Sequence, residues 1–108
     1  MTGAAIIVLT QMPDRASALA LARSLLEMRL AACVSIGGPV ESLYHWRGEI
    51  ETAQEFPLAV KTRSERYAEV EAAIRAQHPY ELPEILAVPV IDGLAQYVDW
   101  IVSETAGA

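Results

Sequence analysis

The chain has 108 residues, of which 53% are hydrophobic, and a formal net charge of −6 at pH 7. This length can bury a core without disulfides or metal ions, and we expect one domain over residues 1–108. The longest apolar run, residues 4–9, is too short to cross a bilayer, and the eight scattered lysines and arginines argue against nucleic-acid binding.

The apolar content is high for a small soluble chain, with a mean hydropathy of +0.25. Because no membrane segment takes up this surplus, we expect a subunit interface and therefore an oligomer. The first residues carry no basic region or apolar stretch typical of a signal peptide, which favours a cytoplasmic location. Cys33, the only cysteine, lies in apolar company and is expected to be a buried, inert thiol.

Strand and helix patterns alternate along the first half. Residues 4–9 are apolar on both faces, which predicts a central strand. Asp14 is then a good N-cap for a helix over residues 15 to about 30. Its expected core-facing stripe is Leu19, Ala22, Leu25, Leu26 and Arg29. Residues 32–36 and 40–46 are predicted to form one long strand, bent or bulged at residues 37–39.

The second half continues with a short turn at residues 47–49 and a returning strand over residues 50–62, which together predict a hairpin. A second helix begins at Ser64 and ends at Pro79. Its expected apolar stripe is Tyr67, Val70, Ala73 and Ile74. Residues 85–91 predict a last strand, in which Pro89 favours an edge position, and a short helix follows from Leu94.

The order of these elements predicts an α+β fold. The simplest packing is a ferredoxin-like, split βαβ sandwich with an extra C-terminal helix, in which two helices cover one face of an antiparallel sheet. The first and third strands of this topology are central and the fourth is an edge. The other face of the sheet has no helix, which is a second reason to expect a partner subunit.

The segment His78-Pro79-Tyr80-Glu81-Leu82-Pro83-Glu84-Ile85 joins the second helix to the last strand. Two prolines stiffen its backbone, so that an imidazole, a phenol and carboxylates stand on a rigid corner. Such a corner suits a functional site, but the same pattern is also typical of a plain helix-to-strand connection. His78 has a simple alternative role as a cap of the second helix.

Several blocks of the sequence resemble the CutA divalent-cation tolerance family. They are residues 31–34, the hairpin of residues 42–51 with its Tyr-X-Trp-X-Gly pattern, Lys61-Thr62, the corner of residues 78–85, and Gly93, Tyr97 and Trp100-Ile101. The resemblance implies a ferredoxin-like fold and a tight homotrimer similar to PII-type signalling proteins, with long hairpins joining neighbouring subunits. It also implies a role in tolerance of, and response to, copper and other divalent cations, without enzymatic activity.

The resemblance bears on metal ligands as well. In one branch of the family, copper is bound by a cysteine at the end of the first strand and two adjacent histidines, and these positions are Thr10, Gln77 and His78 here. We expect His78, with Glu84 from the same corner, to be the candidate ligands for copper or another divalent cation. A trimer would bring three copies together, whereas adventitious binding is the plain alternative. No resident cofactor is expected.

A second possibility is a small-molecule or anion site in the cleft between subunits. A cation, aromatic surfaces and hydrogen-bonding groups would come from Lys61 at the end of the third strand, Tyr44 and Trp46 on the hairpin, and His78, Tyr80 and Glu84 at the corner. Tyr44 and Trp46 would serve equally well as interface packing, since aromatic residues are enriched at interfaces.

An enzymatic function is not expected. With two histidines and one cysteine the inventory for nucleophilic catalysis is thin, and Gly37-Gly38 lacks the lysine and helix start of a phosphate-binding loop. Three classes of function therefore remain: a trimeric metal-binding protein, a PII-like sensor of a metabolite, and a structural trimer that serves as a platform.

Overall fold

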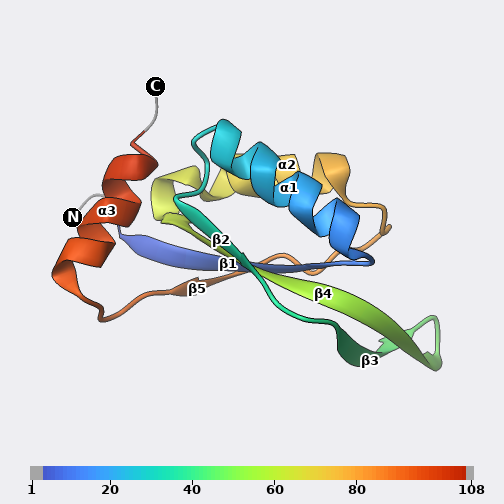
Figure 1. Ribbon diagram of the computed structural model, residues 1–108. Helices are drawn as coiled ribbons and strands as arrows, with labels where there is room; N and C mark the ends of the chain where they lie inside the picture. The colour runs from blue at the N-terminus through green and yellow to red at the C-terminus, as the bar shows by residue number, and fades with distance from the viewer. Residues whose placement is uncertain (1–3, 107–108) are drawn as a thin grey trace.

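The computed structural model describes residues 4–106 (Figure 1). Its elements are β1 (Ala5–Met12), α1 (Arg15–Glu27), β2 (Cys33–Ile36), β3 (Val40–Trp46), β4 (Glu49–Arg63), a 3-10 turn (Ser64–Arg66), α2 (Tyr67–Gln77), β5 (Leu86–Pro89) and α3 (Ala95–Glu104). The sheet is antiparallel with the order β2-β4-β1-β5, and β3 pairs with the far end of β4. The predicted split βαβ arrangement is thus confirmed, with β1 and β4 central and β5 at the edge.

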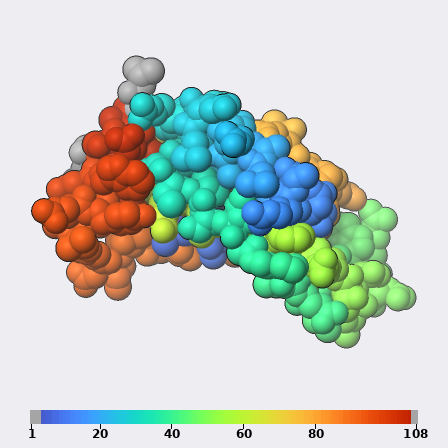
Figure 2. All heavy atoms as spheres, in the orientation of Figure 1, coloured from blue at the N-terminus to red at the C-terminus, as the bar shows by residue number. Residues whose placement is uncertain are grey.

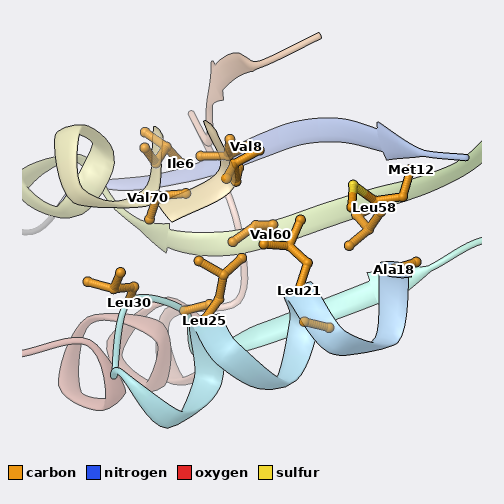
Figure 3. Packing of buried hydrophobic residues seen from close by; sticks show 13 residues of the cluster. Ile6, Val8, Met12, Ala18, Leu21, Leu25, Leu30, Leu58, Val60 and Val70 are labelled. Atoms are coloured by element: carbon orange, nitrogen blue, oxygen red, sulfur yellow. The ribbon is translucent and has the colours of Figure 1, made fainter. Parts of the chain in front are cut away.

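The core lies between one face of the sheet and the helices α1 and α2, which run over that face (Figure 1). Alternate residues of the central strands point toward the helices, and Val8 and Val60 are completely buried there. Leu21 and Leu25 of α1 point at Val60 and Leu58 of β4 (Figure 3). Burial of these apolar side chains provides the main stabilisation of the two layers.

Helix α1 begins where the sequence predicts, because the Asp14 carboxylate accepts a hydrogen bond from the Ser17 backbone N–H at 2.7 Å. The predicted apolar stripe is partly wrong. The buried residues are Ala18, Leu21, Ala22 and Leu25, whereas Leu19 and Leu26 are 42% and 41% exposed. Each of these two leucines follows a buried residue directly and is therefore rotated about 100° away from the core.

The end of α1 also differs from the prediction. Arg29 adopts a left-handed conformation with φ of 60°, its N–H donates to the Leu26 carbonyl, and the Leu30 N–H donates to the Leu25 carbonyl. This is a Schellman motif, and it ends the helix at Glu27. The motif usually carries glycine at the left-handed position. Because an arginine occupies it here, the sequence did not indicate that the helix ends at this point.

The bend between β2 and β3 is a one-residue bulge, as predicted. Ile36 pairs with Leu58 and Val40 pairs with Glu55. The segment from Ile36 to Val40 thus advances by four residues while the paired β4 segment advances by three, which leaves one extra residue in the bulge. The hairpin turns at Arg47 and Gly48, whose φ values of 52° and 81° are those of a type I′ turn.

Together β3 and the end of β4 form an arm that extends beyond the body (Figure 2). The molecule measures 44 × 26 × 23 Å, and its radius of gyration of 14.4 Å exceeds the value of about 13 Å expected for this length. The arm carries few buried side chains of its own. Contacts outside the arm must therefore help to hold β3 and β4 in place. The corner that follows α2 contacts the arm at its base.

The sheet face away from α1 and α2 is open. Strand pairing places Val88, Ile7, Lys61 and Cys33 in one row across it, and Leu86, Leu9, Ala59 and Ser35 in the next. Leu86 is 58% exposed and Val88 40%. The prediction of a buried Cys33 is wrong, since the thiol is only half-buried. It belongs to the row on the open face and not to the core beneath the helices.

Helix α3 lies across the end of the sheet opposite the arm (Figure 1). Ile101 is the residue of this helix that is buried, and the adjoining Thr105 is buried as well. The Nε atoms of Arg63 and Arg66 both donate to the Thr105 carbonyl oxygen at 2.9 Å. Cations at a helix C-terminus are favoured by the helix dipole, so two arginines hold this helix in place. Across residues 4–106, no helix is both long and apolar enough to span a membrane.

Candidate functional site

A groove of about 810 Å³ lies between the arm and the corner that follows α2. We call it the hairpin groove. Its lining consists of Gln11, Glu55, residues 42–46 of β3 and residues 79–84 of the corner. Gln11, Glu55, Tyr44 and Trp46 occupy positions that share the open face of the sheet, so the groove is the arm end of that face.

His78 connects the corner to the end of β1. Its Nε2 atom lies 2.6 Å from the Gln11 carbonyl oxygen, and its Nδ1 atom lies 3.2 Å from the Tyr80 backbone nitrogen. Because a carbonyl only accepts and a backbone N–H only donates, the ring is protonated on Nε2 and accepts on Nδ1. The His78 ring also packs against the Tyr80 ring, with centroids 4.7 Å apart. The backbone N–H of His78 closes α2 onto Ile74, but its ring binds β1 and not the last carbonyls of that helix.

Glu84 is the second predicted metal ligand, and it also contacts Gln11. The Gln11 Nε2 atom donates to Glu84 Oε1 at 3.1 Å. The structure therefore brings His78 and Glu84 to the same residue, one through the main chain and the other through the side chain. Within residues 4–106, no group of three or more histidine, cysteine, aspartate or glutamate side chains is arranged to hold a metal ion.

The positions that carry copper ligands in the resembling family branch have other roles here. Thr10 is buried, and its hydroxyl has no hydrogen-bond partner among the described atoms. Gln77 donates from Nε2 to Ser24 Oγ of α1 at 2.9 Å. Neither side chain offers the soft sulfur or imidazole donor that copper prefers. That three-residue site therefore does not fit this chain.

Glu55 and Tyr80 form the wall of the groove at the base of the arm. Glu55 is only 8% exposed, and the Tyr80 hydroxyl donates a hydrogen bond to its carboxylate. Burial, followed by this hydrogen bond, raises the pKa of Tyr80 to about 12. Neither Glu55 nor Gln11 was predicted to lie at a site, because a single glutamate or glutamine within a strand carries no distinguishing pattern.

Arg47 stands at the rim of the groove. Its guanidinium lies 5.3 Å from the centroid of the Trp46 ring, and its Nη2 atom is 3.0 Å from Glu81 Oε1. A cation is thus placed between an aromatic face and a carboxylate. Both members of the ion pair are well exposed, so it adds little to stability.

Lys61 is not part of the hairpin groove. Its row on the open face contains Ile7 and Cys33, and its Nζ atom donates to the Tyr97 hydroxyl at 3.4 Å and lies 5.5 Å from the Tyr97 ring centroid. Of the four residues predicted for a ligand cleft, the structure brings together Tyr44, Trp46 and Tyr80 in the groove. It leaves Lys61 at the α3 end of the sheet.

Comparison with known proteins gives a consistent result. The family model described as CutA1 divalent ion tolerance protein matches residues 6–104. A divalent-cation tolerance protein CutA of Archaeoglobus fulgidus is 47% identical over 89 residues, which cover 82% of this chain and 86% of the relative. The relative from Thermus thermophilus is 39% identical over 99 residues, covering 92% and 96%.

Solved structures of CutA proteins share the fold as well. The structure from Archaeoglobus fulgidus has a TM-score of 0.90 at 42% identity and covers 94% of this chain and 98% of its own. The structure from Thermus thermophilus has a TM-score of 0.91 at 38% identity and covers 93% and 97%. The antiparallel sheet and its helices are therefore those of the CutA1 structures.

The predicted cytoplasmic location is wrong. The Archaeoglobus fulgidus structure is of a protein described as periplasmic, and a matched relative from Arabidopsis thaliana, 34% identical over 100 residues, is described as chloroplastic. The match with the plant protein includes 93% of this chain but only 55% of the plant protein. Similar folded parts thus occur in different compartments, and the sequence of the folded part does not specify one.

The order of strands, the position of the corner at the base of the arm, and the matches along nearly the whole chain agree with one another. They also agree with the blocks of sequence that carried the resemblance. The chain belongs to the CutA1 divalent ion tolerance protein family.

Proposed function

We propose that this chain acts in divalent-cation tolerance as a homotrimer that binds copper or another divalent cation at the corner, with His78 and Glu84 as ligands. In this proposal residues 1–108 form one domain, which has no enzymatic activity and needs no resident cofactor. The observation that carries the metal-binding part is the convergence of His78 and Glu84 on Gln11.

Metal binding at this corner would require local rearrangement. Both nitrogens of the His78 ring are engaged with backbone groups, and a metal ion needs the lone pair of one of them. Giving up a hydrogen bond of this kind costs about 1 kcal/mol, which lowers affinity by about fivefold. One imidazole and one carboxylate per subunit make a weak site unless neighbouring copies add ligands.

The open sheet face supports the proposal of an oligomer. Its rows contain exposed apolar residues, among them Leu86 and Val88, at the edge of the sheet. An apolar face of this kind, uncovered by any helix, is typical of a surface that is buried against another subunit. The arm beside it extends beyond the body and so presents a further surface to a neighbour (Figure 2).

Titration calorimetry of metal-stripped protein with Cu(II) and Zn(II) tests the metal site. We expect saturable binding at a fixed ratio per subunit that His78→Ala abolishes and Glu84→Gln weakens. Glu27→Gln is the matched control for Glu84→Gln, since Glu27 is exposed on α1, away from the corner. Glu84→Gln leaves the hydrogen bonds of His78 in place, so it remains informative if His78→Ala disturbs the corner. Binding that is unchanged in both variants would refute the assignment.

Sedimentation over a range of concentrations tests the assembly. We expect the mass of three chains for the unmodified protein and a smaller species for Leu86→Asp, which places a charge on the open face. Leu26→Asp is the control, because Leu26 is a similarly exposed leucine on the outer side of α1. A monomer at all concentrations, or equal effects of the two substitutions, would contradict the proposal.

The hairpin groove favours a second candidate function, the binding of a small molecule. Its volume of about 810 Å³ is within the range of small-molecule sites, and Tyr44, Trp46 and Tyr80 line it. A chain that assembles but binds neither metal nor small molecule would instead serve as a structural platform.

A further inference from the structure

The two ends of the open sheet face differ in charge. At the arm end, Glu55, Glu81 and Glu84 line the hairpin groove, and the described residues of this lining include neither lysine nor arginine. At the other end, where α3 crosses the sheet (Figure 1), the Lys61 Nζ atom lies 5.5 Å from the centroid of the Tyr97 ring. Lys61 is the only lysine of the chain. One face therefore carries a group of carboxylates at one end and a single ammonium group at the other.

The carboxylates of the arm end are not balanced within the chain. Arg47 pairs with Glu81 at the rim. In the part of the chain that the structure describes, neither Glu55 nor Glu84 forms an ion pair with a lysine or arginine. Glu55 is only 8% exposed, and its hydrogen-bond donor is the neutral Tyr80 hydroxyl. Burial of a carboxylate is costly unless a positive charge compensates it, so a cation from outside the chain would stabilise this end.

Lys61 has the complementary need. Its ammonium group can donate three hydrogen bonds, and the one that the structure shows goes to the Tyr97 hydroxyl at 3.4 Å. Among residues 4–106, no carboxylate forms an ion pair with it. The two ends cannot pair within one chain, because Lys61 lies beyond Glu55 on the extended strand β4 by about 20 Å. A second copy of the chain offers each end its missing partner.

The symmetry of an assembly decides which ends meet. In a closed ring of three subunits each interface joins two different patches, whereas a two-fold dimer joins a patch to its own copy. A two-fold contact over the groove would place its carboxylates against the same carboxylates of the other chain, which repel one another. A head-to-tail contact places them against an ammonium group. The charges of the open face therefore favour a ring, and the apolar rows between its ends supply area to bury.

We infer that each interface of the homotrimer joins the hairpin groove of one subunit to the α3 end of the open face of the next, where Lys61 pairs with the groove carboxylates Glu55 and Glu84. The ammonium group of the neighbour supplies the cation that the groove of a single chain lacks. Paired charges of this kind fix the register of two surfaces, while the apolar rows contribute most of the buried area. The inference rests on the proposed homotrimer and names the contact that orders its subunits.

A carbodiimide cross-linker tests the contact, because it joins an amine to a carboxylate only where the two groups touch. Lys61 carries the only side-chain amine, so mass spectrometry assigns each amide either to it or to the N-terminus. We expect species of two and three chains on a denaturing gel, with an amide between Lys61 and Glu55 or Glu84. Lys61→Arg is the matched control, since it keeps the cation and the trimer but cannot form this amide.

Charge reversal and sedimentation test whether the contact stabilises the trimer. Glu84→Lys and Lys61→Glu are each expected to raise the concentration of half assembly at least about tenfold, the factor for one lost charge-assisted hydrogen bond. The double variant again places one cation among two carboxylates and is expected to return to within about threefold of the unmodified protein. Arg23→Glu and Glu27→Lys reverse exposed charges on α1 and should change assembly less than twofold. Thermal unfolding shows whether each variant is folded, and cross-linking of the unmodified protein needs no variant.

The outcomes separate this contact from the assembly itself. If the unmodified protein is a monomer at all concentrations, the homotrimer and the contact both fail. If it is a trimer but Lys61 becomes linked to carboxylates outside the groove, or to none, the homotrimer stands and the contact is wrong. The contact is equally wrong if the folded double variant assembles no better than the two single variants.

Discussion

The docking of α3 depends on a shared hydrogen-bond acceptor, and this gives a quantitative prediction. Arg63 and Arg66 both donate from Nε to the Thr105 carbonyl oxygen at 2.9 Å, in a partly buried setting. The helix itself buries one large apolar side chain, that of Ile101. We predict that loss of either arginine weakens α3 slightly, whereas loss of both detaches the helix from the sheet.

The magnitudes follow from these contacts. Burial of Ile101 contributes about 1.5–3 kcal/mol, and a hydrogen bond from a charged donor contributes about 1.5–3 kcal/mol when buried and less at a partly exposed site. Arg63→Ala or Arg66→Ala alone should cost about 1 kcal/mol of unfolding free energy, because the other arginine still satisfies the carbonyl. The double variant should cost about 3–4 kcal/mol, since it also leaves that carbonyl unpaired. The interaction energy is then about 1–2 kcal/mol.

Urea denaturation at a fixed protein concentration measures the free energies of unfolding, and amide hydrogen exchange of residues 97–106 reports detachment of α3. Arg66 also pairs with Glu69 at 2.9 Å, so Glu69→Ala is the control that removes this ion pair and leaves Arg66 bound to Thr105. Additive costs, together with protection of α3 that is unchanged in the double variant, would refute the reasoning.

Three further predictions concern other parts of the molecule. Leu25→Ala should cost about 2–5 kcal/mol of stability and Leu26→Ala less than about 1 kcal/mol in urea denaturation, because Leu25 is fully buried and Leu26 is on the outer surface. Gly48→Ala should cost about 1 kcal/mol in the same assay, since φ is 81°. Because the pKa of Tyr80 is raised from 10.0 to about 12, its stabilising effect is complete below pH 10 and is lost as pH rises toward 12. The effect is about 1 kcal/mol, which allows for screening by solvent, and Glu55→Gln should lower the pKa of Tyr80 in an NMR titration.

Each of these has a clear contrary result. Equal costs for the two leucine variants would mean that the face of α1 assigned to the core is incorrect. A neutral Gly48→Ala would show that the hairpin turn tolerates a side chain and is not type I′ in solution. A Tyr80 that titrates at the same pH with and without Glu55 would show that burial alone sets its pKa.

Much of the fold could be predicted because its signals are local. Asp14 caps α1 through Ser17, three residues away, and the type I′ turn at Arg47 and Gly48 joins residues that are neighbours in sequence. Pro89 at the edge follows from the missing N–H of proline alone. The prediction failed where a local signal was absent, as at Arg29, which ends α1 in a conformation that glycine usually adopts.

The site could be predicted only in part, because its residues acquire their roles through contacts that are remote in sequence. The His78 ring contacts the carbonyl of Gln11, which is 67 residues away in the sequence, and no pattern near Gln11 predicts this contact. The prediction that grouped Lys61 with Tyr44 used the right face of the sheet, since residues 55, 57, 59 and 61 of β4 alternate onto the open side.

Distance along the strand, and not the choice of face, separates Lys61 from the groove. Lys61 lies six residues beyond Glu55 along the extended strand, which corresponds to about 20 Å at 3.3 Å per residue. One face of a single sheet therefore carries two electrostatically different ends: carboxylates and aromatic rings at the arm, and Lys61 with Tyr97 at α3. A ligand confined to the hairpin groove of one chain meets the first end only.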